Sequence, residues 1–292
     1  MTGDPPLPLV GPLAERAFYV DEFAGHAIVV ALPPDVGPVG EVRSVLTRAD
    51  DTLAGGGSRL VVVAGGSEVA RFAAALPGSP SPLLAPSATP DADWLADLWL
   101  AATDGPAVVV SDPSWDGPRT VALAAELAVS LRALKLVIAD PGGGWGLPPR
   151  SFADVSTHAE AYRSQLARRQ GGAVVAAIEG ALAGGVTSVN LCQAVDVDSE
   201  LFTFDGAGTL FTSGGYLELA PLRVDDLTAV EELVAQGVAD GVLRPRDRHE
   251  VARLAVTGLG AKVLGSGHLA GVAGLEGKPY ADQPVSELCS LD

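Results

Sequence analysis

Few residues of this chain belong to the types that commonly do covalent or metal chemistry. The two cysteines, Cys192 and Cys289, lie about a hundred positions apart, and neither belongs to a CxxC pair. The four histidines are scattered along the sequence, at His26, His158, His249 and His268. Metal clusters need such ligands at short, regular spacings. The sequence therefore predicts no metal site, and both cysteines are interpreted as small buried apolar residues.

Lysine is the rarest of the charged residues. Only Lys135, Lys262 and Lys278 occur, against sixteen arginines, and the first 134 residues contain no lysine. Transfer of a phosphoryl group depends on cations that stabilise the negative charge as it spreads over the migrating group. The first half of the chain is poorly equipped for that reaction.

A glycine-rich segment, PGGGWG at 141–146, follows a predicted strand. The backbone N–H groups of such a loop can bind nucleotide phosphates. A mobile surface loop has the same composition, and we favour that second interpretation.

The first two thirds of the chain alternate short apolar runs with helical segments. Runs rich in Val, Ile, Leu and Ala predict strands at 27–32, 58–66, 106–112, 134–140 and 187–194. The segment 172–185 is an alanine-rich predicted helix that ends at paired glycines. Continuous apolar strands are typical of a parallel sheet covered on both faces. The predicted fold class is α/β with a mainly parallel sheet.

The pattern changes in the last third, and we expect a domain boundary near 214–218. Residues 223–243 predict an amphipathic helix that Asp225 and Asp226 cap, and 246–256 predicts a second helix. A β-hairpin is expected at 261–277 and a further strand at 285–291. The Pro, Ser and Ala of 77–93 indicate a loop.

One motif is far more specific than a lone glycine pattern. The segment SELFTFDGAGTLFTSGG at 199–215 resembles the ELFT-x-x-G-x-G-T segment of acetylglutamate kinases and synthases. Residues 18–32 and 58–69 resemble the first strands of the same proteins. Residues 216–251 and 268–291 resemble the start, hairpin and central strand of the GNAT acetyltransferase fold that follows in the synthases. The chain is thus similar to N-acetylglutamate synthases over most of its length, and least so at 77–100.

This resemblance implies two domains and an activity. Residues 1–215 would form a three-layer amino-acid-kinase-like domain, and 216–292 the N-terminal part of an α+β GNAT acetyltransferase domain. The implied reaction transfers an acetyl group from acetyl-CoA to the α-amine of glutamate or a related amino acid, as in arginine biosynthesis. Direct attack within a ternary complex needs a general base, which the sequence does not identify. Acetyl-CoA would be the co-substrate, with no metal.

The departures from the kinase pattern bear on mechanism. The kinases hold phosphates with a lysine in a first loop of the form K-x-G-G, but this chain has VALPPDV, with Ala31 near the lysine position and prolines in place of glycines. Proline has no backbone N–H to donate and fixes φ. A second lysine is missing from QGGAVVAAIEGAL, and an acidic residue expected after the third strand is not evident. Kinase activity is therefore not expected.

The synthases use this domain to bind arginine as a regulator. By resemblance, Glu200, Asp205, Gly206 and Gly208 would line such a site. A carboxylate beside the carbonyl groups of a glycine turn suits a guanidinium or ammonium group. The other interpretation is a tight turn that needs positive φ at its glycines, and we favour it.

The resemblance also assigns residues to the acetyltransferase part. Arg223, Arg246 and Arg248 match basic residues that would bind the two carboxylates of glutamate, with bidentate pairing as the physical reason. A solvated cluster at a helix end is an equally good interpretation of these arginines. The segment Cys289, Ser290 and Leu291 would lie on the strand that pairs with the pantetheine arm of acetyl-CoA. The R/Q-x-x-G-x-G/A loop that binds the pyrophosphate in such folds is not found before Asp292. We expect that catalysis has been lost, that the missing part is supplied elsewhere, or that the sequence is a fragment.

Charge and hydropathy limit the partners. The net charge of −17 argues against a nucleic-acid surface. No apolar run reaches the roughly 20 residues of a membrane helix, and 1–13 is interpreted as a proline-rich, acidic tail without a signal peptide. We expect a cytoplasmic protein that binds a small-molecule amino acid, with arginine as a possible effector. The exposed edge of an incomplete GNAT sheet predicts a homo-oligomer or a partner chain that completes the sheet.

Three functions remain open at this point. The first is the acetyltransferase, and the second is a non-catalytic pseudokinase that binds an amino acid such as arginine and regulates or scaffolds a partner. The third is an enzyme of specialised metabolism that acts on another amino acid, for which the altered 77–100 region is the single indication.

Overall fold

The computed structural model describes residues 12–67, 83–84, 90–104, 107–203, 206–214, 217–239, 241, 243–257, 259–263, 269–280 and 283–291. The chain forms two compact units, Met1–Ser213 and Gly214–Asp292. They are called unit 1 and unit 2 below.

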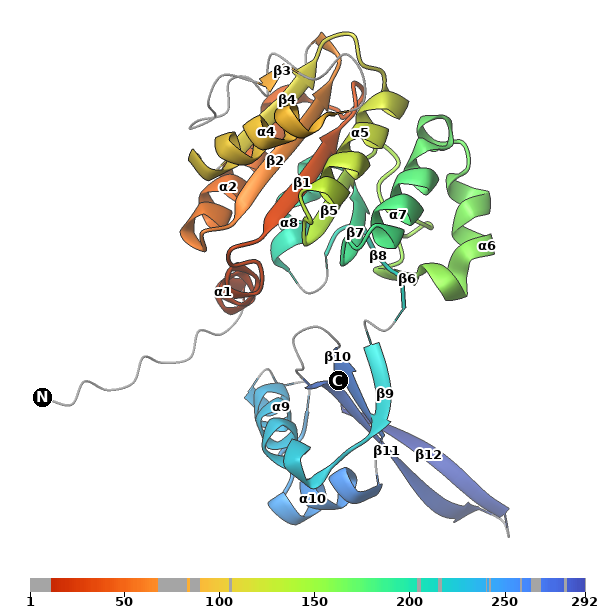
Figure 1. Ribbon diagram of the computed structural model, residues 1–292. Helices are drawn as coiled ribbons and strands as arrows, with labels where there is room; N and C mark the ends of the chain where they lie inside the picture. Colours follow the sequence, from red (N-terminus) through yellow and green to blue (C-terminus); the bar gives the residue numbers. More distant parts are fainter. Residues whose placement is uncertain are drawn as a thin grey trace, which may run out of the picture. The chain divides into compact units, whose positions relative to one another are not determined.

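Unit 1 is built on an eight-stranded sheet of order β3-β4-β2-β1-β5-β7-β8-β6 (Figure 1). All neighbouring strands are parallel except β7 and β8, which are antiparallel. The strands are β1 (Ala27–Leu32), β2 (Arg59–Gly65), β3 (Leu83–Leu84), β4 (Ala107–Asp112), β5 (Lys135–Ala139), β6 (Phe152–Asp154), β7 (Ser188–Cys192) and β8 (Thr209–Thr212). The predicted α/β class and mainly parallel sheet are confirmed.

Two helical layers cover the sheet, and alternate residues of each strand face each layer. Val29 and Ala31 of β1 pack in the core under α4, α5 and α7, whereas Ile28 and Val30 pack under α2 and α8. Both sets are completely buried. This explains why the strands read as continuous apolar runs. The helices are α1 (Pro12–Glu22), α2 (Val39–Gly55), α4 (Ala92–Asp104), α5 (Gly117–Ser130), α6 (Val155–Leu166), α7 (Ala173–Ala183) and α8 (Val197–Phe202).

Two expectations on local structure are tested in this unit. The tail expected at 1–13 is wrong at its last residues, because α1 begins at Pro12, where proline suits the first helical turn; residues 1–11 lie outside the described part. Most of the loop expected at 77–93 also lies outside it, although β3 is a short strand there and α4 begins at Ala92.

Unit 2 is a four-stranded antiparallel sheet of order β12-β11-β10-β9 with two helices. A small core of Val230, Val234, Val251 and Val272 joins the helices to the sheet. The predicted helices, hairpin and last strand are confirmed. The elements are β9 (Leu217–Pro221), α9 (Leu227–Ala239), α10 (Arg248–Thr257), β10 (Leu259–Val263), β11 (Leu269–Tyr280) and β12 (Gln283–Leu291).

A helix must be long and apolar throughout to span a bilayer, and this applies to the described helices of both units. None of them combines the length and the apolar character needed to span one.

Candidate functional site

The parallel sheet of unit 1 has a topological switch point between β1 and β5. From β1 the chain adds β2 and then β4 on one side, and from β5 it adds β7 on the other. In open α/β sheets, ligands bind outside the carboxyl ends of the strands at such a point. A ligand of this sheet would therefore lie beside the loops that follow Leu32 and Ala139.

The loop after β1 is closed by proline. A methyl group added to Gly66, which follows β2 with φ of 79°, would lie 2.9 Å from Pro34 Cβ. The Pro34 ring thus packs directly against the backbone after β2. Pro33 and Pro34 have no N–H groups, so this loop cannot bind phosphate as a glycine loop does.

The loop after β5 is held in place by Arg169. Its guanidinium Nη1 lies 3.2 Å from Asp140 Oδ1 and also donates to the Gly143 carbonyl oxygen, and Nη2 donates to the Gly144 carbonyl oxygen at 3.1 Å. Asp140 and Trp145 are almost completely buried. The interpretation of 141–146 as a mobile surface loop is therefore corrected. The sequence could not reveal this contact, because Arg169 lies more than twenty positions away in an arginine pair that looks solvated.

The only lysine of unit 1 lies at the opposite end of the sheet. Lys135 is the first residue of β5 and is 8% exposed, and its Nζ donates to Asn190 Oδ1 at 2.9 Å. Burial lowers the pKa of Lys135 to about 8, against the opposing effect of the Glu200 charge. This ammonium group is part of the core and does not reach the carboxyl ends of the strands.

The predicted regulatory residues form a closed, internal arrangement. Glu200 on α8 is 7% exposed, and its Oε2 accepts hydrogen bonds from the Ala207 and Gly208 backbone N–H groups, both at 2.7 Å. Its Oε1 accepts from Asn190 Nδ2. Gly206 has φ of 59° and lies under the same carboxylate. In this geometry Glu200 holds the turn, as the tight-turn interpretation expects; Asp205 lies outside the described residues.

The predicted arginines of unit 2 are only partly brought together. Arg246 and Arg248 line a cavity of about 400 Å³ with α9 residues such as Val234 and Val238. Arg248 Nε contacts Glu231 Oε1 at 2.7 Å on the surface, whereas Arg246 makes no hydrogen bond or ion pair with the described residues. Arg223 does not line this cavity. It precedes α9, and its backbone N–H donates to Asp226 Oδ2. This contact belongs to the helix start at which the sequence predicts a cap by Asp225 and Asp226.

The predicted cofactor segment lies on the end strand of the unit 2 sheet. Cys289, Ser290 and Leu291 of β12 pair with Gly274, Ala273 and Val272 of β11. β12 is last in the strand order. Its second edge therefore faces no strand of this sheet.

Comparison with solved structures gives the fold of the whole chain. An N-acetylglutamate synthase from Neisseria gonorrhoeae, complexed with coenzyme A and N-acetyl-glutamate, matches 96% of this chain and 80% of its own, with a TM-score of 0.53 and 19% identity. The same enzyme complexed with coenzyme A and L-arginine matches 92% of this chain and 79% of its own, with a TM-score of 0.56 and 18% identity. The chain has the N-acetylglutamate synthase fold. No protein-family model matches the sequence, and no curated protein is similar to it.

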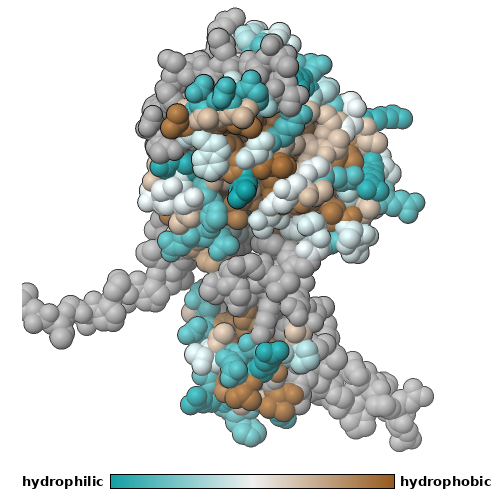
Figure 2. All heavy atoms as spheres, viewed as in Figure 1, coloured by the Kyte–Doolittle hydropathy of each residue, from teal (hydrophilic) through white to brown (hydrophobic). Residues whose placement is uncertain are grey.

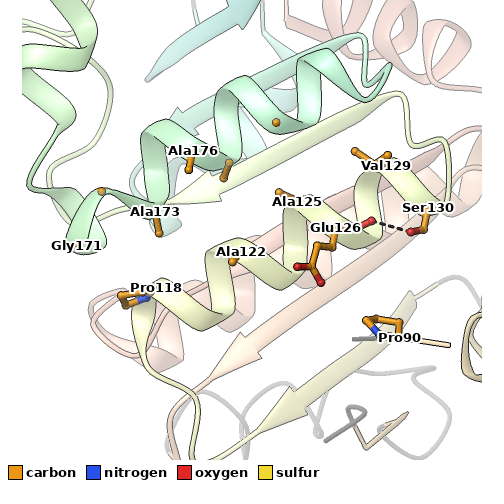
Figure 3. Close-up of a pocket in the computed structure, with 13 residues that line it drawn as sticks. Pro90, Pro118, Ala122, Ala125, Glu126, Val129, Ser130, Gly171, Ala173 and Ala176 are labelled. Carbon is orange, nitrogen blue, oxygen red and sulfur yellow. Dashed lines mark hydrogen bonds between the residues drawn. The ribbon is translucent and has the colours of Figure 1, made fainter. Parts of the chain in front are cut away.

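Within this synthase fold, unit 1 carries an apolar groove that the sequence does not indicate. The groove has a volume of about 840 Å³ and lies between the outer faces of α5 and α7 (Figure 3). Its walls are small residues such as Ala122, Ala125, Ala173 and Ala176, and Glu126 is the only charged side chain among the described residues that line it. Figure 2 shows brown, tan and white atoms across this face of unit 1. The groove can accept an apolar group but has few polar atoms for chemistry.

The described part of the chain shows no cluster of three His, Cys, Asp or Glu side chains that could hold a metal ion. Unit 1 has no lysine at the switch point, because its single lysine, Lys135, is the first residue of β5.

Proposed function

We propose that the chain is an amino-acid N-acetyltransferase of the N-acetylglutamate synthase type, in which unit 1 does not phosphorylate. The likeness to the gonococcal synthase extends over 96% of the chain and so includes both units. This continuous match, at 19% identity, is the observation that carries the proposal. The substrate would be glutamate or a related amino acid, and the acetyl donor would be acetyl-CoA.

The strand order of unit 2 supports a GNAT-type acetyltransferase. Its four antiparallel strands follow one another as neighbours, with α9 and α10 inserted between β9 and β10. An end strand such as β12 offers backbone N–H and C=O groups along its outer edge. In the proposal, the amide groups of the pantetheine arm pair with this edge near Cys289 to Leu291.

The arginines of unit 2 would bind the amino-acid substrate. Arg246 lines the cavity and has no partner among the described residues, so its guanidinium is available for a carboxylate. Arg248 would exchange its ion pair with Glu231 for a second carboxylate. A neutral substrate amine would then attack the thioester carbonyl, the thiolate of CoA would leave, and the amine proton would pass to a base or to water.

The test measures CoA release from acetyl-CoA with each of the common amino acids. We expect turnover with an acidic amino acid, and a KM for that amino acid raised at least about tenfold in Arg246→Gln, the loss of one charge-assisted pair. Arg244→Gln removes a nearby arginine that does not line the cavity and serves as the control. Absence of CoA release with every amino acid, alone and with candidate partner chains, would rule the proposal out.

The second candidate is a non-catalytic protein that binds an amino acid and regulates a partner. It is favoured by the proline-closed loop after β1 and by Arg169, which is engaged with Asp140 and two loop carbonyls. Calorimetry with arginine and glutamate separates the two candidates. Binding without any CoA release supports the regulator, and binding with release supports the enzyme. The cytoplasmic location and the oligomer or partner chain remain predictions that cell fractionation and light scattering would test.

A further inference from the structure

A second cavity of unit 1 lies at the amino ends of the strands, away from the switch point. It has a volume of about 250 Å³. Four segments far apart in the sequence line it: the turn into β1, the start of β2, the middle of α4 and the C-terminal end of α5. The lining residues are Gly25, His26, Ala27, Arg59, Val61, Trp99, Ala102, Leu131 and Arg132.

The charge of this cavity is opposite to that of the chain. The chain has 36 acidic and 19 basic residues. Yet Arg59 and Arg132 line the cavity, and none of the nine described lining residues is acidic. Such a local excess of positive charge on an acidic protein favours a small anion at this place.

Arg59 is held ready for a ligand. Its Nη1 donates to the carbonyl oxygens of Gly57 and Ser58 at 3.1 and 3.2 Å, and its side chain makes no other contact of a polar kind with the described residues. The guanidinium is therefore positioned by one nitrogen, and Nε and Nη2 keep their hydrogens for an acceptor. A group fixed in this way loses little entropy when it binds.

Arg132 occupies a backbone position that glycine would adopt more easily. It follows Leu131, the residue that caps the C-terminal end of α5, and has φ of 50°. Only one other non-glycine residue of the described chain, Gln170, has positive φ. A left-handed residue at this point of a helix end is usually glycine, because a side chain adds strain there. Arginine at this position carries an exposed guanidinium to the rim of the cavity, where it has no partner among the described residues.

The remaining walls suit a flat ring. Trp99 is 53% exposed, although most large apolar side chains of unit 1 are buried. Val61 and Leu131 form an apolar floor with almost no exposed surface. An aromatic ring on the floor would cover the exposed part of the indole, and aromatic pairs gain free energy beyond their buried area.

The volume limits the size of the ligand. A cavity of roughly 150 Å³ holds benzene, and drug-sized ligands need about 300 Å³ or more. A volume of about 250 Å³ therefore suits one ring or a fused pair of rings with a single anionic group.

We propose that this cavity is a binding site for a small aromatic anion, a flat ring that carries a carboxylate or a phosphate. The ring lies against Trp99 over the Val61 and Leu131 floor, and the anionic group pairs with Arg59 and Arg132. The site belongs to unit 1 alone and does not depend on acetyl transfer by the chain.

The test uses benzoate, indole-3-carboxylate and phenyl phosphate as probes with the full chain at fixed salt. Calorimetry should give Kd values of about 0.1–5 mM, in the range for ligands of this size. The indole N–H signal of Trp99, assigned with Trp99→Phe, should shift in nitrogen-edited NMR spectra. Benzamide, which has no charge, and cyclohexanecarboxylate, which is not flat, should each bind at least about tenfold more weakly than benzoate. The carboxylate and phosphate probes together identify which anionic group is preferred.

Two arginine variants separate binding from folding. Arg132→Gly relieves the strained backbone, so it should raise the melting temperature and still weaken benzoate binding at least about tenfold. Arg168→Gln removes an exposed arginine that does not line the cavity and should leave binding unchanged. The proposal is overturned if no probe shifts the Trp99 signal at 10 times the upper expected Kd, if benzamide binds as well as benzoate, or if Arg132→Gly and Arg168→Gln bind alike.

Discussion

Lys135, Asn190 and Glu200 form a polar chain inside unit 1 that joins two strands to the turn after α8. Lys135 Nζ donates to Asn190, Asn190 donates to Glu200, and Glu200 accepts from the turn. All three side chains are buried. A buried network is costly when any member loses its partner. The network therefore explains the fixed turn without any ligand.

The free energy of unfolding should depend on pH through the titration of Lys135. Its pKa falls from an unfolded value of 10.5 to about 8 in the folded protein, chiefly through burial. The unfolded chain thus binds more protons between these values, and stability should rise from pH 8 to 10.5. The change in the free energy of unfolding that this pKa shift causes is at most about 3 kcal/mol.

Urea unfolding of wild type and Lys135→Met, measured at intervals from pH 7 to 10, checks this. Tryptophan fluorescence reports unit 1, because the four tryptophans are Trp94, Trp99, Trp115 and Trp145. The free energy of unfolding of wild type, relative to that of Lys135→Met, should increase as the pH rises. Parallel pH profiles would contradict the prediction, and Lys262→Met in unit 2 is the control.

Two glycines of unit 1 should respond in opposite directions to alanine. A methyl group on Gly208 would lie 2.7 Å from Cys192 Cβ and still closer to the Leu191 carbonyl oxygen, whereas one on Gly180 of α7 meets nothing within 4 Å. Gly208→Ala should cost about 2–4 kcal/mol, because backbone must move. Gly180→Ala should stabilise the helix by about 0.5–1 kcal/mol. Thermal melting measures both, and similar melting temperatures for the two variants would disprove the close contact.

At the scale of elements, Arg16 fastens α1 to two other helices. Its Nη2 lies 2.7 Å from Asp198 Oδ1 on α8 and 2.6 Å from Thr52 Oγ1 on α2, and the guanidinium lies 4.5 Å from the Phe202 ring centre. Bidentate pairs of this kind are among the stronger polar contacts. The helix before the sheet is thereby linked to α8, which also carries Glu200.

Without this contact, α1 should detach locally from α2 and α8 while the rest of unit 1 stays folded. In Arg16→Met we expect hydrogen exchange within 12–22 to accelerate about 5- to 30-fold, which corresponds to about 1–2 kcal/mol of local opening free energy. Arg48→Met is the matched variant, because Arg48 lies 3.9 Å from the same Asp198 and is more exposed. It should change exchange much less, and equal effects in both variants would contradict a specific role for Arg16.

The elements differ in how well the sequence predicts them. The five strands 27–32 to 187–194 were predictable, because burial on both faces leaves continuous apolar runs. Most of the short α8 and all of β8 lie inside the motif at 199–215, where the glycine turn dominates the pattern. Elements of six or fewer residues are too short to show a periodicity. The cavity with Arg59 and Trp99 was beyond prediction, because its walls come from four segments that only the sheet order brings together.

At the scale of the whole molecule, the sequence resemblance carried by the ELFT-x-x-G-x-G-T motif and the match to solved structures agree on the fold. The structure places the predicted site residues in different surroundings. Arg246 and Arg248 share a cavity, Arg223 does not, and Glu200 faces inward. A motif predicts the backbone conformation, because that conformation requires glycine at fixed positions. It predicts less about which side chains remain free for ligands, since that depends on partners distant in sequence.

The chain as a whole should not transfer phosphoryl groups. A kinase of this fold would need ammonium groups at the carboxyl ends of β1 and β5, but the only lysine of unit 1 lies buried at the amino end of β5. Pro34 packs on Gly66 where phosphate would need N–H donors, and Arg169 is already paired with Asp140. With ATP, Mg²⁺ and N-acetylglutamate or free amino acids, trapping with hydroxylamine should therefore detect no acyl phosphate above the level without protein, whereas an acetylglutamate kinase run in parallel should give a strong signal. Acyl phosphate formed at a rate that scales with the concentration of this chain would mean that its arginines replace the lysines.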